Sequence, residues 1–271
     1  MSVLILGCGF TGRRVARLLE QDGLPVMALR RAQIDFTGTD AVTQLAALAP
    51  PDCLVLHSIP SLPDKADERL LVALEGRARR IVYLSTTGVY GDAADVDETT
   101  PTAPRTPREE ARVHTELAVQ AGPWESLILR PAAIYGPGRG VQISMAEGRY
   151  TLVGDGSNYI SRIHVDDLAR IAHAALLAEL TGAYPVADLY PCPSREIAEY
   201  CAAQFGWPMP VSGGAGEVPA TRRNNRRVDG RAIGQRLGVP LLYPTYREGI
   251  AQAMGEQPVP GTYIAPVDKR R

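Results

Sequence analysis

The feature that most constrains this chain is a short apolar segment that runs directly into a glycine-rich turn. Val3-Leu4-Ile5-Leu6 is followed by Gly7-Cys8-Gly9-Phe10-Thr11-Gly12, and apolar residues then recur at helical spacing. A short, wholly apolar run is typical of a strand buried on both faces of a parallel sheet. A strand, a G-x-G-x-x-G turn and a helix in this order predict a dinucleotide-binding unit.

Each residue of this turn has an expected part in holding a dinucleotide. Gly7 permits the tight turn, Gly9 lets the backbone approach a pyrophosphate, and Gly12 lets the helix pack closely on the strand. Phe10 and Thr11 complete the turn at the start of the helix, where backbone N–H groups have no helical partner. The turn therefore predicts an anion site.

Short apolar segments alternate with helical patterns through the first half of the chain. Strands are expected at Val3–Leu6, Pro25–Leu29, Cys53–His57, Ile81–Leu84 and Ser126–Leu129, and helices at Arg13–Gln21, Thr39–Leu48, Asp64–Gly76 and Glu109–Ala121. This alternation predicts an α/β fold of the Rossmann type, in which a doubly wound parallel sheet is covered on both faces.

The regular alternation loosens after Arg130. Later helices are expected at Val165–Leu180, Ser194–Phe205 and Gly230–Leu237. We predict a dinucleotide-binding Rossmann core over residues 1–135 and a smaller C-terminal substrate lobe over 136–254, interleaved with the last core elements. Residues 255–271 contain prolines and a basic end, and are expected to form an extended tail.

Charge and cysteine content narrow the classes of partner. The formal net charge is −1, from 29 Lys and Arg against 30 Asp and Glu, so no basic field favours nucleic acid. No apolar run approaches the roughly 18 residues that span a bilayer. The cysteines (Cys8, Cys53, Cys192 and Cys201) have neither C-x-x-C spacing nor a histidine at ligand spacing. We therefore expect free thiols, no metal site and a reducing, cytoplasmic location.

The end of the second predicted strand bears on the choice of cofactor. An NAD site usually carries Asp or Glu there for the ribose 2′-hydroxyl, whereas this chain has Arg30 and Arg31. A guanidinium can bind a 2′-phosphate through two hydrogen bonds. We therefore predict NADP(H), with NAD(H) as the alternative cofactor and a solvated arginine pair as the alternative interpretation. Asp35 and Phe36 follow where an adenine edge is expected.

Several segments in order resemble a known family. They are Leu84–Gly91 (LSTTGVYG), Leu129–Pro137 (LRPAAIYGP), Ile163–Leu168 (IHVDDL), and, near the end, Leu237-Gly238 and Tyr243–Gly249. Over nearly the whole chain, the pattern is similar to that of the extended and atypical short-chain dehydrogenase/reductases, in particular the NAD-dependent epimerase/dehydratase family. One departure is Leu6, because that family carries a glycine there.

The resemblance implies further cofactor and substrate residues. Ser58 and Ser85, which follow predicted strands, and Pro131 of the LRP segment are expected beside the cofactor. Tyr135, His164 and Arg226 are expected beside the substrate. Arg226 lies in a cluster with Arg222, Arg223 and Arg227, and family members use such arginines to hold the diphosphate of a nucleotide sugar. A solvated basic loop is the alternative.

The catalytic helix departs from the family pattern. Where the family has Tyr-x-x-x-Lys, this chain has Arg108 and Arg112, although the later acid is kept as Glu116. The tyrosine is the family's general acid/base, and the lysine lowers its pKa and holds the nicotinamide ribose. Arginine stays protonated, so Arg108 cannot readily accept a proton, whereas Arg112 can keep the binding and electrostatic part of the lysine.

Other hydroxyl groups are candidates for the missing chemistry. Thr86 and Thr87 are placed to hold a substrate oxygen, and Tyr90 is either a substitute acid/base or a ring packed beside the cofactor. An active site would enclose a cavity lined by Thr86, Tyr90, Arg108 and Pro131.

Two functions follow as expectations. The favoured one is an NADP(H)-dependent oxidoreductase or epimerase that acts on a hydroxyl or carbonyl group of a small molecule, such as a nucleotide sugar. The alternative is a non-catalytic NADP(H)-binding redox sensor or regulator, because the Tyr–Lys pair is lost. By resemblance alone, the helices expected at Asp64–Gly76 and Glu109–Ala121 would form a homodimer interface.

Overall fold

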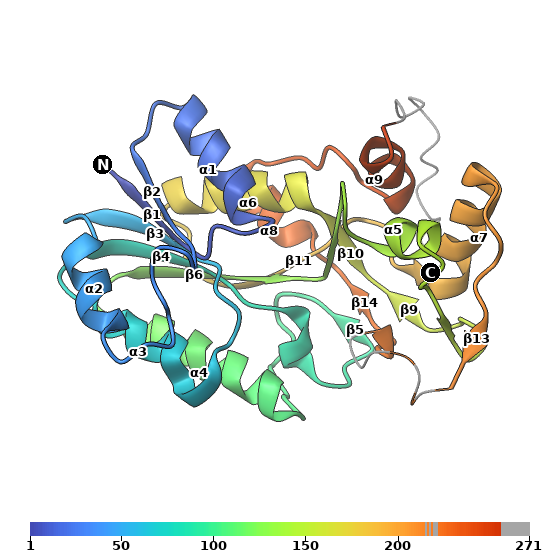
Figure 1. Cartoon of the computed structure of the whole chain (residues 1–271), viewed down its shortest axis with the longest axis horizontal. Coiled ribbons are helices and arrows are strands. Elements are labelled where there is room, and N and C mark those ends of the chain that lie inside the picture. The colour runs from blue at the N-terminus through green and yellow to red at the C-terminus, as the bar shows by residue number, and fades with distance from the viewer. Residues whose placement is uncertain (215, 217, 219–221, 256–271) are drawn as a thin grey trace.

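A six-stranded parallel sheet forms the centre of the molecule (Figure 1). The computed structural model describes residues 1–214, 216, 218 and 222–255. In spatial order the strands are β11 (Gly182–Val186), β6 (Glu125–Pro131), β4 (Ala78–Leu84), β3 (Cys53–His57), β1 (Val3–Leu6) and β2 (Val26–Leu29). The chain passes from β1 to β2 on one side and then returns to β3 on the other. The strand order therefore reverses beside β1, and open α/β sheets bind ligands at such a reversal.

Helices cover both faces of this sheet. One face carries α1 (Gly12–Gln21), α6 (Val165–Leu177) and α8 (Arg231–Leu237), and the other carries α2 (Ala41–Leu48), α3 (Ala66–Val72) and α4 (Pro107–Ala121). Alternate residues of β1 face the two helix layers. Val3 and Ile5 pack in the apolar core under α1, α6 and α8, and Leu4 and Leu6 pack in the core under α2, α3 and α4. Period-two alternation in a strand buried on both faces explains why every position is apolar.

The chain after β6 adds a smaller region at the carboxyl ends of the strands. Its helices are α5 (Val141–Ala146), α7 (Ser194–Phe205) and α9 (Tyr246–Ala253). Its short strands pair as β7 (Ala133–Tyr135) with β10 (Arg162–His164), β8 (Leu152–Val153) with β13 (Ser212–Gly213), and β9 (Tyr159–Ile160) with β12 (Cys192–Pro193); β14 (Arg227–Val228) pairs with β5 (Asp95–Val96). A separate apolar cluster that includes Met145, Ile197 and Tyr246 fills this lobe.

Two short 3₁₀ helices, η1 (Pro63–Lys65) and η2 (Thr87–Tyr90), complete the elements that bear on the site. The longest helix, α4, begins with a capping box in which Thr106 and Glu109 bond each other's backbone N–H groups, with Pro107 in the first turn. This start fixes where Arg108 and Arg112 lie relative to the sheet.

The α/β fold with its smaller C-terminal region confirms the sequence prediction, and each of the strands predicted there is present. The prediction missed the sixth strand, β11, because it contains a glycine and Pro185. Pro185 is tolerated because β11 is at the sheet edge and, in the described part of the chain, pairs with β6 alone. Helix α9 was also missed, and residues 256–271 of the expected tail lie outside the described residues.

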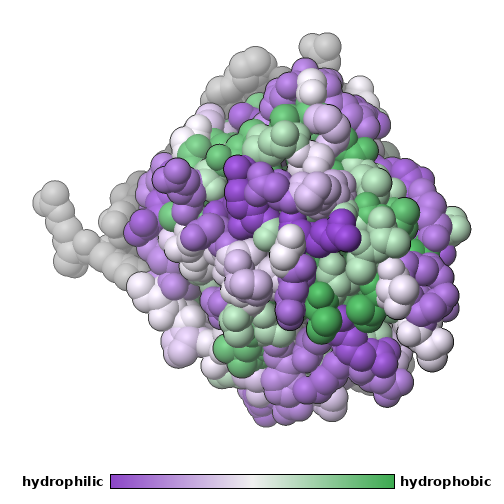
Figure 2. All heavy atoms as spheres, turned by 90° about the vertical axis from the view of Figure 1, so that its left-hand side faces the viewer, coloured by the Kyte–Doolittle hydropathy of each residue, from purple (hydrophilic) through white to green (hydrophobic). Residues whose placement is uncertain are grey.

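The outer surface opposite the lobe is mixed in character. Figure 2, seen from the end where the strands begin, shows hydrophilic side chains interspersed with smaller apolar patches. Among the residues that the structure describes, no helix combines the length and the apolar character that crossing a membrane requires.

Candidate active site

The glycine turn closes the carboxyl end of β1 against that of β3. Gly7 has a φ of +86°, and a Cβ there would lie 2.9 Å from the carbonyl carbon and oxygen of Ser58. The Ser58 hydroxyl donates to the Gly7 carbonyl at 2.6 Å. A Cβ on Gly12 would lie 3.0 Å from that same carbonyl oxygen. Packing of the protein itself therefore requires glycine at positions 7 and 12.

Gly9 differs from the other two glycines. It is exposed, and a Cβ there would meet only the Gly7 carbonyl oxygen, at 3.9 Å. Contacts within the protein therefore do not require a glycine at position 9. Among the described residues, no acceptor is recorded for the backbone N–H groups of Phe10 and Thr11, which precede α1. An open backbone beside free N–H groups at a helix start is suited to a phosphate.

A cavity of about 240 Å³ lies beside this turn. It is lined by Cys8, Arg13, Ala16, Arg17, Glu20, Ala28 and Arg30. Arg30 follows β2, and its Nη2 lies 4.0 Å from Cys8 Sγ. Arg13 and Arg17 were not predicted from the sequence as site residues, although a spacing of four residues puts both on one face of a helix. Arg31 is exposed and does not line this cavity.

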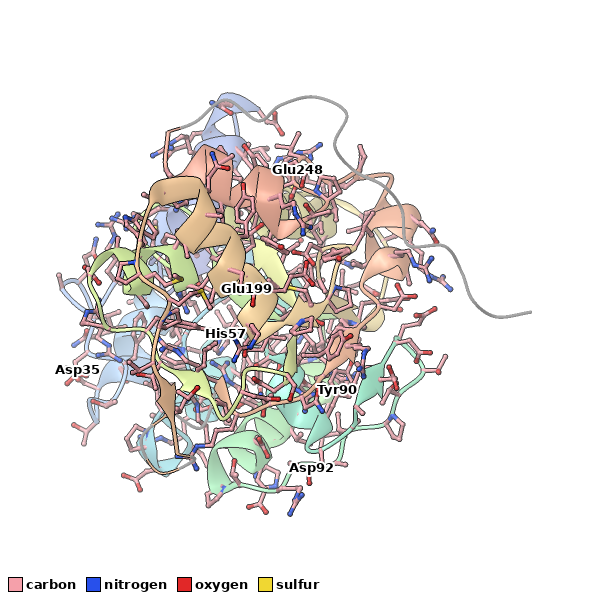
Figure 3. The ribbon with its side chains drawn as sticks, turned by 90° about the vertical axis from the view of Figure 1, so that its right-hand side faces the viewer. Asp35, His57, Tyr90, Asp92, Glu199 and Glu248 are labelled. Atoms are coloured by element: carbon pink, nitrogen blue, oxygen red, sulfur yellow. The ribbon has the colours of Figure 1, made fainter. Side chains whose placement is uncertain are left out.

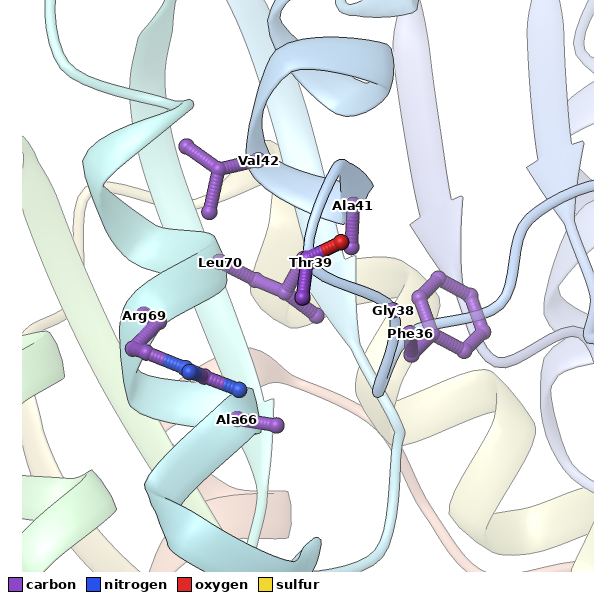
Figure 4. A pocket seen from close by; sticks show the side chains of 8 residues that line it. All are labelled: Phe36, Gly38, Thr39, Ala41, Val42, Ala66, Arg69 and Leu70. Atoms are coloured by element: carbon purple, nitrogen blue, oxygen red, sulfur yellow. The ribbon is translucent and has the colours of Figure 1, made fainter.

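A second cavity, of about 90 Å³, lies between α2 and α3 (Figure 4). It is lined by Phe36, Gly38, Thr39, Ala41, Val42, Ala66, Arg69 and Leu70. The neighbouring Asp35 is exposed, and its Oδ1 accepts from the Thr37 N–H at 3.0 Å and the Thr37 hydroxyl at 2.7 Å. These hydrogen bonds hold the pKa of Asp35 below its usual value. The contact of Asp35 with an adenine stays a prediction.

Arg112 joins the ends of β3 and β4. Its Nη1 donates to the Tyr83 hydroxyl at 2.7 Å, to the Ile59 carbonyl at 3.2 Å and to the Leu84 carbonyl at 3.3 Å. Within the described part of the chain, no partner is recorded for its Nε or Nη2. Arg112 is thus anchored through one nitrogen and retains donors for a ligand, while its role in place of the family's lysine stays a prediction.

Hydroxyl groups gather where β4 ends. Thr86 is half-buried and accepts from the Gly88 N–H at 3.1 Å, which caps η2. Because it accepts there, its own hydroxyl proton remains available to a ligand. Thr87 is half-buried, and the Ser85 hydroxyl is buried with no recorded partner among the described residues.

The remaining predicted residues at this end come from neighbouring elements. Pro131 ends β6 and is buried, whereas Arg108 is exposed in the first turn of α4.

Tyr90 lies inside the protein. Its side chain has 0% exposure, and its hydroxyl accepts from Arg130 Nη1 at 3.2 Å. Arg130 in turn forms a two-pronged ion pair with Glu116, with a shortest distance of 2.7 Å. Burial raises the pKa of Tyr90 above its ordinary value. In Figure 3, seen from the lobe end, Tyr90 falls within the outline of the molecule and Asp92 lies toward its lower margin. A substrate cannot reach this hydroxyl in the described conformation.

Arg226 is likewise occupied. Its side chain is 5% exposed, and its guanidinium donates to the main-chain oxygens of Thr87, Gly91 and Ala93, the last at 3.1 Å. Arg226 therefore holds the segment that follows β4, and the structure does not support the expected contact with a substrate diphosphate.

The other arginines of the cluster also have protein partners. Arg222 donates to the Ser144 hydroxyl, Arg223 donates to the Val218 carbonyl, and the Arg227 guanidinium lies 3.7 Å from the centre of the Tyr159 ring.

Tyr135 and His164 form the base of the lobe. The Tyr135 hydroxyl donates to the Thr245 carbonyl at 3.4 Å. The rings of Tyr135 and His164 pack edge to face, with centroids 5.2 Å apart. His164 Nδ1 accepts from the Asp166 N–H at 3.3 Å and caps α6. Burial lowers the pKa of His164 to about 4, so its ring is neutral at neutral pH. Both side chains are buried, and their contact with a substrate stays a prediction.

Asp188, which the sequence analysis did not single out, lies just after β11. It is 1% exposed, and its Oδ1 accepts from the Tyr190 N–H at 3.2 Å, while no partner is recorded among the described residues for Oδ2. Burial raises its pKa to about 8. Nothing in its sequence context marks it, because its burial depends on elements distant in the chain.

Comparisons with known proteins agree with this fold. Residues 3–187 match the NAD dependent epimerase/dehydratase family. The 2-alkyl-3-oxoalkanoate reductase of Stenotrophomonas maltophilia is 28% identical, over an alignment that covers 77% of this chain and 77% of that protein. Protein YeeZ of Escherichia coli K12 is 27% identical, over 89% of this chain and 96% of that protein.

Solved structures give the same result. A functionally unknown conserved protein from Silicibacter pomeroyi has 31% identity and a TM-score of 0.76, covering 95% of this chain and 99% of that one. UDP-glucose 4-epimerase from Thermotoga maritima has a TM-score of 0.78 at 18% identity, covering 94% and 98%, which shows a shared fold.

Proposed function

Because this chain belongs to the NAD-dependent epimerase/dehydratase family, we propose that it is an NADP(H)-dependent oxidoreductase that reduces a small carbonyl compound. The glycine turn, the free N–H groups and the ends of β3 and β4 fit a dinucleotide of the kind that this family binds. The proposed preference for NADP(H) rests on Arg13, Arg17 and Arg30. The proposed reduction rests on the arginine at position 108, where the family has a tyrosine.

The observation that carries the cofactor preference is the cavity beside Cys8. Arg13, Arg17 and Arg30 line it together, with Glu20 as the single carboxylate. A phosphate monoester carries close to two negative charges at neutral pH, and arginine binds it through paired hydrogen bonds. A ribose 2′-hydroxyl carries no charge and would use few of the donors that these three exposed guanidinium groups offer. This cavity is therefore suited to the 2′-phosphate of NADP(H).

The residues at the end of β4 suit the reduction of a carbonyl group. NADPH, when bound, supplies the hydride. A carbonyl group that accepts this hydride would gain negative charge on its oxygen, and the Thr86 hydroxyl would stabilise that charge by donating a hydrogen bond. Arg108, in the first turn of α4, would add a positive charge, and Arg112 would hold the nicotinamide ribose through its remaining donors.

The missing tyrosine favours an oxidoreductase over an epimerase. Epimerisation through an oxidised intermediate needs a group that takes and returns the proton of a hydroxyl. Arg108 cannot do so, and Tyr90 has no exposed surface. Reduction requires stabilisation of the oxyanion and a proton from water. Since Arg226 is bonded to backbone oxygens, the site gives less support to a nucleotide sugar than to a smaller carbonyl compound.

The relative from Stenotrophomonas maltophilia suggests which carbonyl compounds to test first. Its name describes the reduction of a 2-alkyl-3-oxoalkanoate. We therefore propose 3-oxo acids and simple ketones as the substrate class. The assay follows the loss of reduced-nicotinamide absorbance when wild-type protein, NADPH and each carbonyl compound are mixed.

Matched variants separate chemistry from folding in this assay. Thr86→Val removes the hydroxyl and keeps the shape, and we expect kcat to fall about 100-fold, as for loss of one oxyanion donor. Thr86→Ser keeps the hydroxyl and should retain most of the activity. Arg79→Gln, at an exposed site near the start of β4, is the charge-matched control for Arg108→Gln. Interconversion of nucleotide sugars without reduction of any carbonyl compound would contradict the proposal.

A second candidate function is supported by the lack of an accessible acid/base group at the end of β4. Arg108 stays protonated, and the Tyr90 side chain has no exposed surface. A non-catalytic sensor needs the cofactor but not an acid/base group. It would bind NADPH and NADP⁺ with clearly different affinities and would reduce no member of the carbonyl panel.

A further inference from the structure

Among the described residues, no acid partner is recorded for the Arg139 guanidinium, which lies next to the glycine turn. Its Cζ is 5.4 Å from the centroid of the Phe10 ring. In the part of the chain that the structure describes, no hydrogen bond or ion pair is recorded for its side chain, which is exposed. A cation stacked on a residue of the phosphate-binding turn, and not otherwise engaged, is placed to meet an anion there.

The backbone of Arg139 is held by a rigid local structure. The Gly136 N–H donates to the Arg139 carbonyl at 2.9 Å, and the Arg139 N–H donates back at 3.0 Å. The buried Gln142 amide donates to both of these carbonyls, each at 3.0 Å. Gly136, Gly138 and Gly140 all have positive φ, which allows so tight a turn. The lobe thus presents Arg139 from a fixed backbone.

The Phe10 ring links this turn to the Rossmann core. A Cβ on Gly136 would lie 3.6 Å from Phe10 Cζ, so the ring abuts the lobe segment that carries Arg139. Arg14 also stacks on Phe10, at 4.5 Å, but its charge is engaged: its Nε donates to Asp166 Oδ1 at 2.7 Å and its Nη1 to the Phe10 carbonyl at 2.9 Å. Of the two arginines on this ring, Arg139 is the one with no hydrogen bond or ion pair recorded for its side chain among the described residues.

We propose that Arg139 is a cofactor-binding residue contributed by the lobe, and that it binds the pyrophosphate of the dinucleotide together with the free N–H groups of Phe10 and Thr11. This inference deepens the proposed function and rests on it, since it requires a dinucleotide at the glycine turn. A pyrophosphate held between these donors would also tie the lobe to the core when the cofactor binds.

The test compares NADPH and NADH binding, by fluorescence titration, to wild type and Arg139→Gln. Both cofactors contain the pyrophosphate, so the variant should weaken both by the same factor, roughly 10- to 100-fold for loss of a charge-assisted hydrogen bond. Arg30→Gln should weaken NADPH alone. Arg139→Lys should keep part of the affinity, because it keeps the charge and loses the planar fork. Arg79→Gln is the control for a general change of charge.

A further arm uses adenosine 2′-monophosphate, which has the 2′-phosphate and no pyrophosphate. Arg139→Gln should leave its affinity unchanged, and the thermal midpoint of the variant should equal that of wild type, because the side chain is exposed. Unchanged NADPH binding by Arg139→Gln, or an equal loss for adenosine 2′-monophosphate, would overturn the role of Arg139. Equal binding of NADPH and NADH by wild type, with both weakened in Arg139→Gln, would support Arg139 and reject the NADP(H) preference. Failure of wild type to bind either cofactor would reject both.

Discussion

Replacing Gly9 by alanine should abolish cofactor binding without destabilising the protein, whereas replacing Gly7 should destabilise the fold. The two glycines lie in one turn, but a Cβ on Gly7 would be 2.9 Å from the Ser58 backbone and a Cβ on Gly9 only 3.9 Å from the Gly7 carbonyl oxygen. Gly7 also has a φ of +86°. The pair therefore separates the part of the turn that the fold requires from the part that a ligand requires.

The magnitudes follow from these contacts. For Gly7→Ala, the left-handed backbone costs about 1–2 kcal/mol and the overlap about 1–3 kcal/mol, so the free energy of unfolding should fall by roughly 2–5 kcal/mol. For a chain of this size, that lowers the melting midpoint by roughly 4–20 °C. Gly9→Ala should leave stability unchanged or raise it by about 0.4–1 kcal/mol, since alanine restricts the unfolded chain.

For cofactor binding, in contrast to stability, we expect the large effect from Gly9→Ala. The Gly9→Ala methyl group would keep a pyrophosphate from the free N–H groups of Phe10 and Thr11. Loss of two charge-assisted hydrogen bonds amounts to about 3–6 kcal/mol, or more than about 100-fold in Kd. Thermal unfolding and NADPH titration of both variants measure the two effects. If Gly9→Ala melts as early as Gly7→Ala, or binds NADPH like wild type, this account of the turn is refuted.

Further predictions concern the buried polar groups. Glu116→Gln breaks an ion pair with Arg130 whose side chains are 3% and 10% exposed, and should lower the free energy of unfolding in urea by about 3–5 kcal/mol. Tyr90→Phe should leave turnover unchanged and cost about 1 kcal/mol, measured in the same way; a large loss of kcat would restore Tyr90 as a catalytic candidate. Burial raises the pKa of Asp188 from 3.8 to about 8, so the folded state binds more protons between these values. The stability that this group contributes is complete below pH 3.8 and is lost as the pH rises toward about 8, so the melting midpoint should fall over this range. Asp188→Asn should flatten this fall. A fall in melting midpoint with pH as steep as that of wild type would contradict the prediction.

The fold was predictable because its signals are local. The apolar run at Val3–Leu6, the glycine turn and the spacing of later strands each depend on neighbouring residues. The sixth strand escaped because Gly182 and Pro185 are poor strand residues, and their edge position is a property of the whole sheet. Arg13 and Arg17 could have been found from their helical spacing beside Arg30.

The roles of Tyr90 and Arg226 could not be read in the same way. Tyr90 is closed off by Arg130 and Glu116, which come from β6 and α4. Arg226 is occupied by carbonyl groups more than 130 residues earlier in the chain. In a sequence, an arginine that binds backbone oxygens cannot be told from one that binds a substrate phosphate. Only the tertiary contacts distinguish the two roles.

The proposed binding of NADP(H) depends on the cavity lined by Arg13, Arg17 and Arg30. The most direct measurement is a fluorescence titration of purified protein with NADPH and with NADH, repeated for Arg30→Asp. We expect NADPH to bind at least about tenfold more tightly than NADH, and the variant to lose this preference through repulsion of the 2′-phosphate. Equal affinity for the two cofactors in wild type, or a preference that survives Arg30→Asp, would contradict the claim.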